Sequence, residues 1–335
     1  MPEGNAFSLM ATGRNVIYFP YIQVPNNSWF SNILLYWDRV YSIVPLEYYS
    51  YPTLLEDHTR TLIKENLLKP LHPAYYIEKI PDFETRFLAI ADKQNSHHND
   101  TTTTRVHIEK LGSLSNELIE RGYAKRLEYP WFSVKRNIAN QFMLYLATEL
   151  GKLNQIHAKP VTDELIHNEV CQIREKRQHK LELTISQIRP PILKQLLPSP
   201  IEEIEPRAIL SFKEDHGDLL VKFRGAIEDK LIDLAALPED TRDDAISLFI
   251  EEKKTQMNEL RQLMDDRGWR TKLWDVAGYS IASLGAAYTV LKGDPSIIGP
   301  TFGFSSLIFK YLGQKNRMVP NDMAYAVLAE KRFIG

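Results

Sequence analysis

Residues 16–49 read VIYFPYIQVPNNSWFSNILLYWDRVYSIVPLEYY, and this stretch decides the fold. Residues 16–19 are a short run of β-branched and aromatic side chains before a proline, which is typical of a buried strand. Asn27 or Ser28 can cap a helix, because apolar residues then recur at helical spacing. Residues 40–44 form a second extended run. A strand–helix–strand unit normally builds a parallel strand pair, so the stretch predicts an α/β domain with a mostly parallel or mixed sheet.

Further elements are expected downstream of this unit. Apolar spacing predicts helices over residues 51–68, 82–92, 138–153 and 161–186. Residues 93–104, KQNSHHNDTTTT, are polar and have no periodicity, so a surface loop is expected there.

A proline-rich segment marks the expected domain boundary. Five prolines fall in RPPILKQLLPSPIEEIEP, residues 189–206, and we expect no continuous helix through them. This segment is predicted to connect an α/β domain, residues 1–188, with an all-helical domain, residues 207–335. One apolar stripe of the second domain predicts the first helix of an antiparallel pair, and its members are Leu220, Phe223, Ile227, Leu231 and Leu234.

The composition is that of a globular protein with no global electrostatic preference. The chain has 335 residues, 44% of them hydrophobic and 25% charged, and a formal net charge of −2. This charge gives no general argument for binding nucleic acid or an anionic membrane. A single cysteine excludes an internal disulfide, and the opening MPEGNAFSLM lacks the layout of a signal peptide. We therefore expect a cytoplasmic protein. The alternative is a peripheral location at the inner membrane.

Two stretches carry a family resemblance. The run YFPYIQVPNNSWFSNILLYWDRVYSIVP resembles the N-terminus of an uncharacterised bacterial family that opens with a YYPY-type strand, a Trp-led helix ending in LLYWD and an IVP strand. The run LLPSPIEEIEPRAILSFKEDHGDLLVKFR is similar to that family's LPxP segment followed by ILxF and LxxFR. The resemblance implies a bacterial or phage-related cytoplasmic protein, and it brings no activity or catalytic residue with it.

Common catalytic signatures are absent from the sequence. It contains no Walker motif, GxSxG, HExxH or paired CxxC, which excludes common enzyme classes but not a hydrolase or nuclease with dispersed carboxylates. Glu47 follows the second predicted strand, where parallel sheets bind ligands, and is the better catalytic candidate. Asp38, at the end of the helix, is expected to bond backbone amides instead. No glycine-rich turn follows the first strand, so we expect no dinucleotide and no other cofactor.

One set of residues has the spacing of metal ligands. Glu164, His167 and Cys171 would share one face of a helix and could hold a divalent cation. The adjacent stripe of Ile166 and Val170 favours another interpretation, in which Cys171 is a small core residue. We therefore predict no metal site.

Basic and aromatic residues alternate between positions 121 and 136. Such a pattern can neutralise and stack on a single-stranded nucleic acid. It also fits a strand pair with aromatic core residues and solvated charges, which we favour because the chain as a whole is not basic. The candidate contacts are Lys125, Arg126, Trp131, Lys135 and Arg136.

The segment 276–312 holds two apolar stretches rich in small residues, which let helices approach closely. Basic residues flank it, as expected of a hairpin that enters a bilayer from the cytoplasm. Each stretch is shorter than the roughly 20 residues needed to span a membrane, so a buried helical hairpin is favoured. The candidate membrane positions are Gly278, Gly285, Gly299 and Gly303.

The absence of catalytic motifs favours a non-enzymatic interaction or scaffold protein. Its partner would be another protein or a second copy of the chain, and a role in a bacterial defence or stress system is one hypothesis. The alternatives are a membrane-perturbing effector acting through residues 276–312, and an enzyme with its site at the strand ends of the N-terminal domain.

Overall fold

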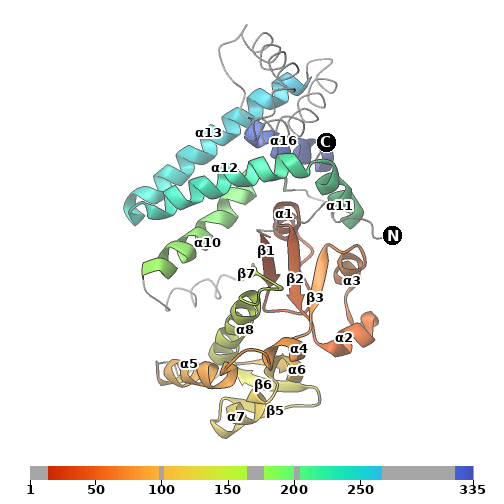
Figure 1. Cartoon of the computed structure of the whole chain (residues 1–335), viewed down its shortest axis with the longest axis vertical. Helices are drawn as coiled ribbons and strands as arrows, with labels where there is room; N and C mark the ends of the chain where they lie inside the picture. The colour runs from red at the N-terminus through yellow and green to blue at the C-terminus, as the bar shows by residue number, and fades with distance from the viewer. Residues whose placement is uncertain (1–13, 98–101, 164–176, 200–203, 266–320, 335) are drawn as a thin grey trace, which may run out of the picture. The chain divides into compact units, whose positions relative to one another are not determined.

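The computed structural model describes two compact units (Figure 1). The described residues are 14–97, 102–163, 177–199, 204–265 and 321–334. The first unit holds the described residues up to 187 together with those between 199 and 213, and the second holds 188–198 and the described residues from 214 onward. The prediction of an α/β N-terminal region followed by a helical C-terminal region is confirmed.

Sheet A has four parallel strands in the order β3-β2-β1-β7. β1 (Asn15–Tyr18) and β2 (Arg39–Ile43) are joined by α1 (Ser28–Tyr36). The side chain of Asn27 accepts a hydrogen bond from the Phe30 amide at 3.0 Å and caps α1. The predicted strand–helix–strand unit is therefore confirmed.

The two edge strands of sheet A each contain a proline. β3 (Leu68–Leu71) includes Pro70, and β7 (Ala158–Val161) includes Pro160. A proline lacks the N–H of the strand ladder and is tolerated at a sheet edge. The helix predicted over 51–68 is wrong at Leu68, which begins β3, and the helix predicted from 161 is wrong at Val161, which ends β7.

Short helices follow the strands of sheet A along the chain. α2 (Leu46–Ser50) and η1 (Pro52–Leu54) follow β2, and α3 (Asp57–Lys64) leads to β3. After β3 come α4 (Ala74–Ile77) and α5 (Phe83–His97). α5 therefore includes residues 93–97, where a loop was predicted.

Both faces of sheet A are covered. On one face, the ring of Tyr18 contacts Trp29 and Phe30 of α1, with centroid distances of 6.2 and 5.8 Å. On the other, Ile17 and Ile43 belong to the core that also includes side chains of α8 (Arg136–Gly151). Burial on both faces is the usual condition of a parallel sheet and explains its continuous apolar strands.

Sheet B is antiparallel, with the order β4-β6-β5. Its strands are β4 (Thr103–His107), β5 (Ala124–Arg126) and β6 (Trp131–Lys135). The short helices α6 (Ile108–Leu111) and α7 (Leu114–Glu120) lie between β4 and β5 in the sequence. One face of the sheet contributes Val106, Phe132 and Val134 to the core.

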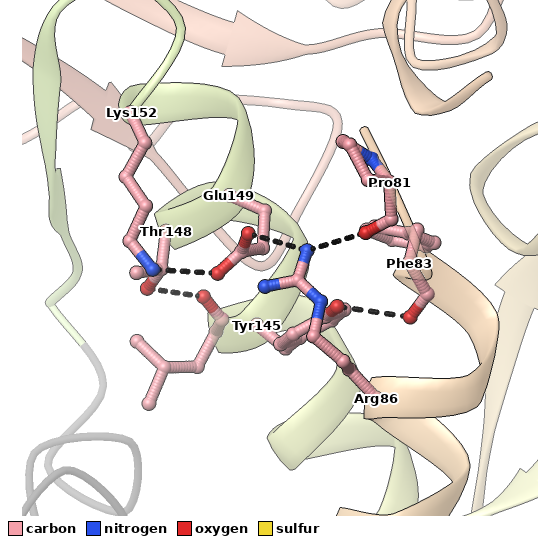
Figure 2. Close-up of polar contacts among 8 residues, drawn as sticks. Pro81, Phe83, Arg86, Tyr145, Thr148, Glu149 and Lys152 are labelled. Atoms are coloured by element: carbon pink, nitrogen blue, oxygen red, sulfur yellow. Dashed lines mark hydrogen bonds and ion pairs between the residues drawn. The ribbon is translucent and has the colours of Figure 1, made fainter. Parts of the chain in front are cut away.

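Polar contacts join α5 to α8 beside this core (Figure 2). The buried carboxylate of Glu149 accepts hydrogen bonds from Arg86 at 3.0 Å and from Lys152 at 2.7 Å. The Tyr145 hydroxyl donates to the Phe83 carbonyl at 2.9 Å. Since a buried carboxylate is tolerated only when it is paired, these bonds constrain how the two helices pack.

The second unit contains α12 (Gly217–Ala236) and α13 (Glu239–Asp265), which follow one another as a helical hairpin (Figure 1). All five residues of the predicted stripe on α12 are buried. η3 (Asn321–Met323) and α16 (Ala324–Phe333) pack against both helices, and the ring of Tyr325 stacks on Phe223 at 5.9 Å.

α10 (Arg177–Leu196) includes Pro190 and Pro191 but ends at Leu196, so a helix enters the proline-rich segment without continuing through it. A proline removes one helical hydrogen bond, but contacts on the following turn offset that loss. Ile192 and Leu196 are buried, and Arg189 makes two hydrogen bonds with the Glu228 carboxylate at 2.9 and 2.8 Å.

α11 (Pro206–Asp215) belongs to the first unit as far as Lys213. The Lys213 amine donates to the carbonyls of Leu34 and Trp37 at 2.8 and 2.6 Å. These carbonyls lie at the C-terminal end of α1, where a cation also compensates the helix dipole.

Among the helices that the structure describes, none is both long enough and apolar enough to cross a membrane. Residues 276–312 and their four glycine candidates lie outside the described residues.

Gly151 tests the contact between α8 and β7. A Cβ at this position would overlap the Ala158 carbonyl oxygen, with the carbonyl carbon at 3.2 Å. We expect Gly151→Ala to lower the free energy of unfolding by about 1–3 kcal/mol, because backbone must move. Gly225→Ala, in a helical position with open space, should raise it by about 0.5–1 kcal/mol. Chemical denaturation of both variants checks this, and equal effects would contradict the close contact.

Candidate functional site

A cluster of polar side chains lies at the carboxyl edge of sheet A. β1, β2 and β3 are parallel, so the segments that follow them meet at one edge of the sheet. Ligands of open α/β sheets bind at such an edge. β4 and α6 add three polar residues to this region, His107, Glu109 and Lys110.

His107 is buried at the end of β4 and has a partner for each ring nitrogen. Its Nδ1 accepts from the Glu109 backbone N–H at 3.2 Å, and its Nε2 lies 3.0 Å from the Glu47 carboxylate. Because a backbone N–H can only donate, Nδ1 must be the acceptor, and the proton is therefore on Nε2. The imidazole thus donates to Glu47 and links β4 to α2.

The Glu109 carboxylate holds the start of α2. It accepts hydrogen bonds from the backbone amides of Leu46 and Glu47, the latter at 3.4 Å. These amides belong to the first turn of α2, whose N–H groups have no partner within the helix. A carboxylate supplied by α6 therefore satisfies them.

Lys110 is almost fully buried, with 4% of its surface exposed. Its amine donates to the Pro20 carbonyl, just beyond β1, at 3.0 Å. Burial lowers the pKa of Lys110 from 10.5 to about 7, because the charged amine loses its hydration. The amine therefore joins α6 to the loop that follows β1.

Aromatic rings pack against this cluster. The rings of Tyr48 and Trp131 contact His107 edge-on, with centroid distances of 6.2 and 5.2 Å. Burial raises the pKa of the Tyr48 hydroxyl, and the nearby Glu47 carboxylate adds to this shift. Further out, the His72 ring lies 5.3 Å from Tyr49 and 5.7 Å from Tyr75.

Several large side chains at this edge are exposed, and we call them the tyrosine surface. Ring contacts through His72 connect Tyr49 with Tyr75. The side-chain amide of Gln23 donates a hydrogen bond to the Leu54 carbonyl and accepts one from the Glu56 backbone N–H. The loop after β1 therefore lies beside η1. The tyrosine surface consists of Tyr21, Tyr49, Tyr51, Leu54 and Tyr75, each about half exposed or more.

The structure separates the two carboxylates singled out in the sequence. Glu47 lies at the carboxyl edge, as predicted, beside His107. Asp38 immediately precedes β2 and so lies at the opposite edge, where its backbone N–H donates to the Arg14 carbonyl at 3.1 Å. Sequence reasoning missed His107, Glu109 and Lys110 as neighbours of Glu47, because they are about 60 residues away in the chain.

The five nucleic-acid candidates divide between the two faces of sheet B and a helix. Strand alternation and register place Lys125, Trp131 and Lys135 on one face. Arg126 pairs with Phe132 on the other face, and Arg136 begins α8. The register also places Arg105 across from Ser133, on the face of Lys125. Arg105 was missed because only the pairing of β4 with β6 brings it there.

The metal candidates Glu164, His167 and Cys171 lie outside the described residues. Within the part of the chain that the structure describes, no group of three or more His, Cys, Asp or Glu residues could hold a metal ion.

Comparison of the chain with protein-family models, curated proteins and solved structures found no match. The family resemblance noted in the sequence therefore stays a prediction. The role of the polar cluster at the carboxyl edge of sheet A is therefore inferred from its geometry.

The buried Lys110 amine predicts a specific pH dependence. Between its folded pKa of about 7 and its unfolded value of 10.5, the unfolded chain binds more protons at this site. The contribution of Lys110 to the free energy of unfolding therefore rises with pH, by at most about 1.4 kcal/mol per unit. From about pH 7.5 to 9.5, we expect wild type to gain stability relative to Lys110→Met with this slope. Chemical denaturation at several pH values measures it.

Lys64→Met is the matched control, because Lys64 is exposed in the same unit and its loss removes the same charge. Its free energy of unfolding should run parallel to that of wild type over this pH range. If the free energy of unfolding of Lys110→Met also runs parallel to that of wild type, the Lys110 amine is not buried in its neutral form and the prediction is contradicted.

Proposed function

We propose that this chain is a non-enzymatic interaction protein that binds another protein through the tyrosine surface. The observation that carries the proposal is the gathering of five large exposed side chains at one edge of sheet A. Contiguous exposed patches of this kind mark interaction sites in folded proteins.

The polar cluster behind the tyrosine surface supports a structural role. A general base needs a free acceptor atom within reach of its substrate. Both nitrogens of His107 already have partners, and the Glu109 carboxylate is bonded to the amides of α2. The Lys110 amine is buried against the Pro20 carbonyl. These contacts brace α2 and the loop after β1 against α6.

The chemistry of the surface fits a protein partner. Tyrosine offers a large flat contact area and a hydroxyl while losing little conformational entropy, and it is enriched in interface cores. The brace holds the backbone of α2, which carries Tyr49, so part of the ordering that binding requires is already present in the free protein. Affinity at such surfaces is concentrated in a few aromatic side chains.

The other functional hypotheses have less support. The membrane-effector hypothesis depends on residues 276–312, which the structure does not describe. The enzyme hypothesis relies on Glu47, and one oxygen of its carboxylate accepts a hydrogen bond from the buried His107 imidazole. A role in a bacterial defence or stress system stays a prediction.

Site-specific photo-crosslinking in the native host tests the proposal. A benzophenone amino acid replaces either Tyr51 or Leu248, which are 65% and 66% exposed and belong to different units. We expect position 51 to give a discrete crosslinked protein and the matched position 248 not to give it. Adding Tyr49→Glu and Tyr75→Glu should reduce that product at least about tenfold, because aromatic contacts concentrate the binding energy.

The mass of the product identifies the partner, and twice the mass of the chain indicates a second copy. Equal products from both positions, or a product that survives the two glutamate substitutions, would contradict binding at the tyrosine surface.

A further inference from the structure

Sheet B presents a second surface, on the face opposite its core. Lys125 on β5 and Arg105 on β4 both lie opposite Ser133 on the central strand β6. Residues in register on antiparallel strands share a face, so the two cations flank one hydroxyl. Adjacent strands are about 4.8 Å apart, which puts the two cationic positions about 10 Å from each other. Arg105 and Lys125 are both exposed.

The charge of this region differs from that of the chain. Residues 103–107 and 124–136 contain five cationic side chains and a single carboxylate, Glu128, whereas the whole chain has a formal net charge of −2. Lys135 is engaged within the protein, since its amine donates to Asn95 at 2.9 Å and lies over the Tyr123 ring. Arg105 and Lys125 are therefore the cationic side chains of this face that we expect to meet a partner.

Aromatic rings lie beside these cations. The Arg105 guanidinium stacks over the Trp131 ring, 4.8 Å from its centroid. Tyr129, in the turn between β5 and β6, is 82% exposed. Flat guanidinium and aromatic groups are the platforms on which unpaired bases stack.

We propose that this face of sheet B binds a single-stranded nucleic acid, with phosphates on Arg105 and Lys125 and bases stacked on Tyr129 and the Arg105–Trp131 pair. The partner is anionic because the exposed charged side chains that the strands carry on this face, Arg105 and Lys125, are cationic; the nearby Glu47 carboxylate comes from α2 and bonds His107. It is single-stranded because stacking needs unpaired bases. Three short strands offer room for about two or three nucleotides. This site is separate from the tyrosine surface, so either can fail without the other.

Fluorescence anisotropy of the full chain tests the proposal. The probes are labelled oligo(dT) and oligo(U) of about 12 nucleotides, with a duplex of the same length for comparison. We expect single strands to bind more tightly than the duplex, with an affinity that falls as salt rises from about 50 to 200 mM. The two single strands distinguish DNA from RNA as the ligand.

Two variants separate the phosphate contacts from the stacking contacts. Arg105→Gln with Lys125→Gln should weaken binding about tenfold or more and lower the salt slope by about 1.4, since each lost phosphate contact removes about 0.7. Tyr129→Ala should weaken binding about fivefold or more and leave the salt slope unchanged. All of these side chains are exposed, so circular dichroism should report an unchanged fold.

Lys64→Gln with Lys159→Gln is the matched control, because it removes two exposed positive charges elsewhere on the same unit. It should leave affinity and salt slope close to those of wild type. Equal losses in the control and in the Arg105 and Lys125 variant would overturn the proposal, and so would no binding at about 50 mM salt. Displacement of the oligonucleotide by polyglutamate at equal charge would assign the face to an acidic protein instead.

Discussion

The hydrogen bond from His107 to Glu47 is the interaction on which the carboxyl edge of sheet A depends. A buried imidazole must satisfy one donor and one acceptor, and leaving either without a partner costs about 1–3 kcal/mol. His107 meets this requirement by joining a backbone amide of α6 to a carboxylate of α2. This bond and the bonds of the Glu109 carboxylate to the first amides of α2 together hold α2, and Tyr49 on it.

The same imidazole lies between the two surfaces proposed to bind partners. Tyr48, which precedes Tyr49 of the tyrosine surface, and Trp131, which begins β6 of sheet B, both pack edge-on against the ring. Lys110 adds a buried amine only three residues along the chain, which binds the loop after β1. The buried His107 and Lys110 side chains thus hold in place the backbone segments that carry exposed aromatic residues.

Local signals in the sequence predicted the first unit well where neighbouring residues decide the structure. The cap at Asn27 and the apolar runs on either side of α1 were sufficient for the strand–helix–strand unit. Edge strands were missed because Pro70 and Pro160 look like breaks until the strand order shows that they lie at sheet edges. Glu47 was placed by a general rule for parallel sheets, but its partner His107 depends on long-range strand placement.

The direct test of this account is the tautomer of His107, measured by nitrogen-15 NMR of its imidazole. We expect a slowly exchanging proton on Nε2 and an Nδ1 with the chemical shift of a hydrogen-bond acceptor. In Glu47→Leu the Nε2 proton loses its acceptor and should exchange faster, whereas Nδ1 should keep its acceptor shift because the Glu109 backbone N–H still donates to it. A proton on Nδ1, or two tautomers in rapid exchange, would contradict the brace and would leave His107 free to act as a base.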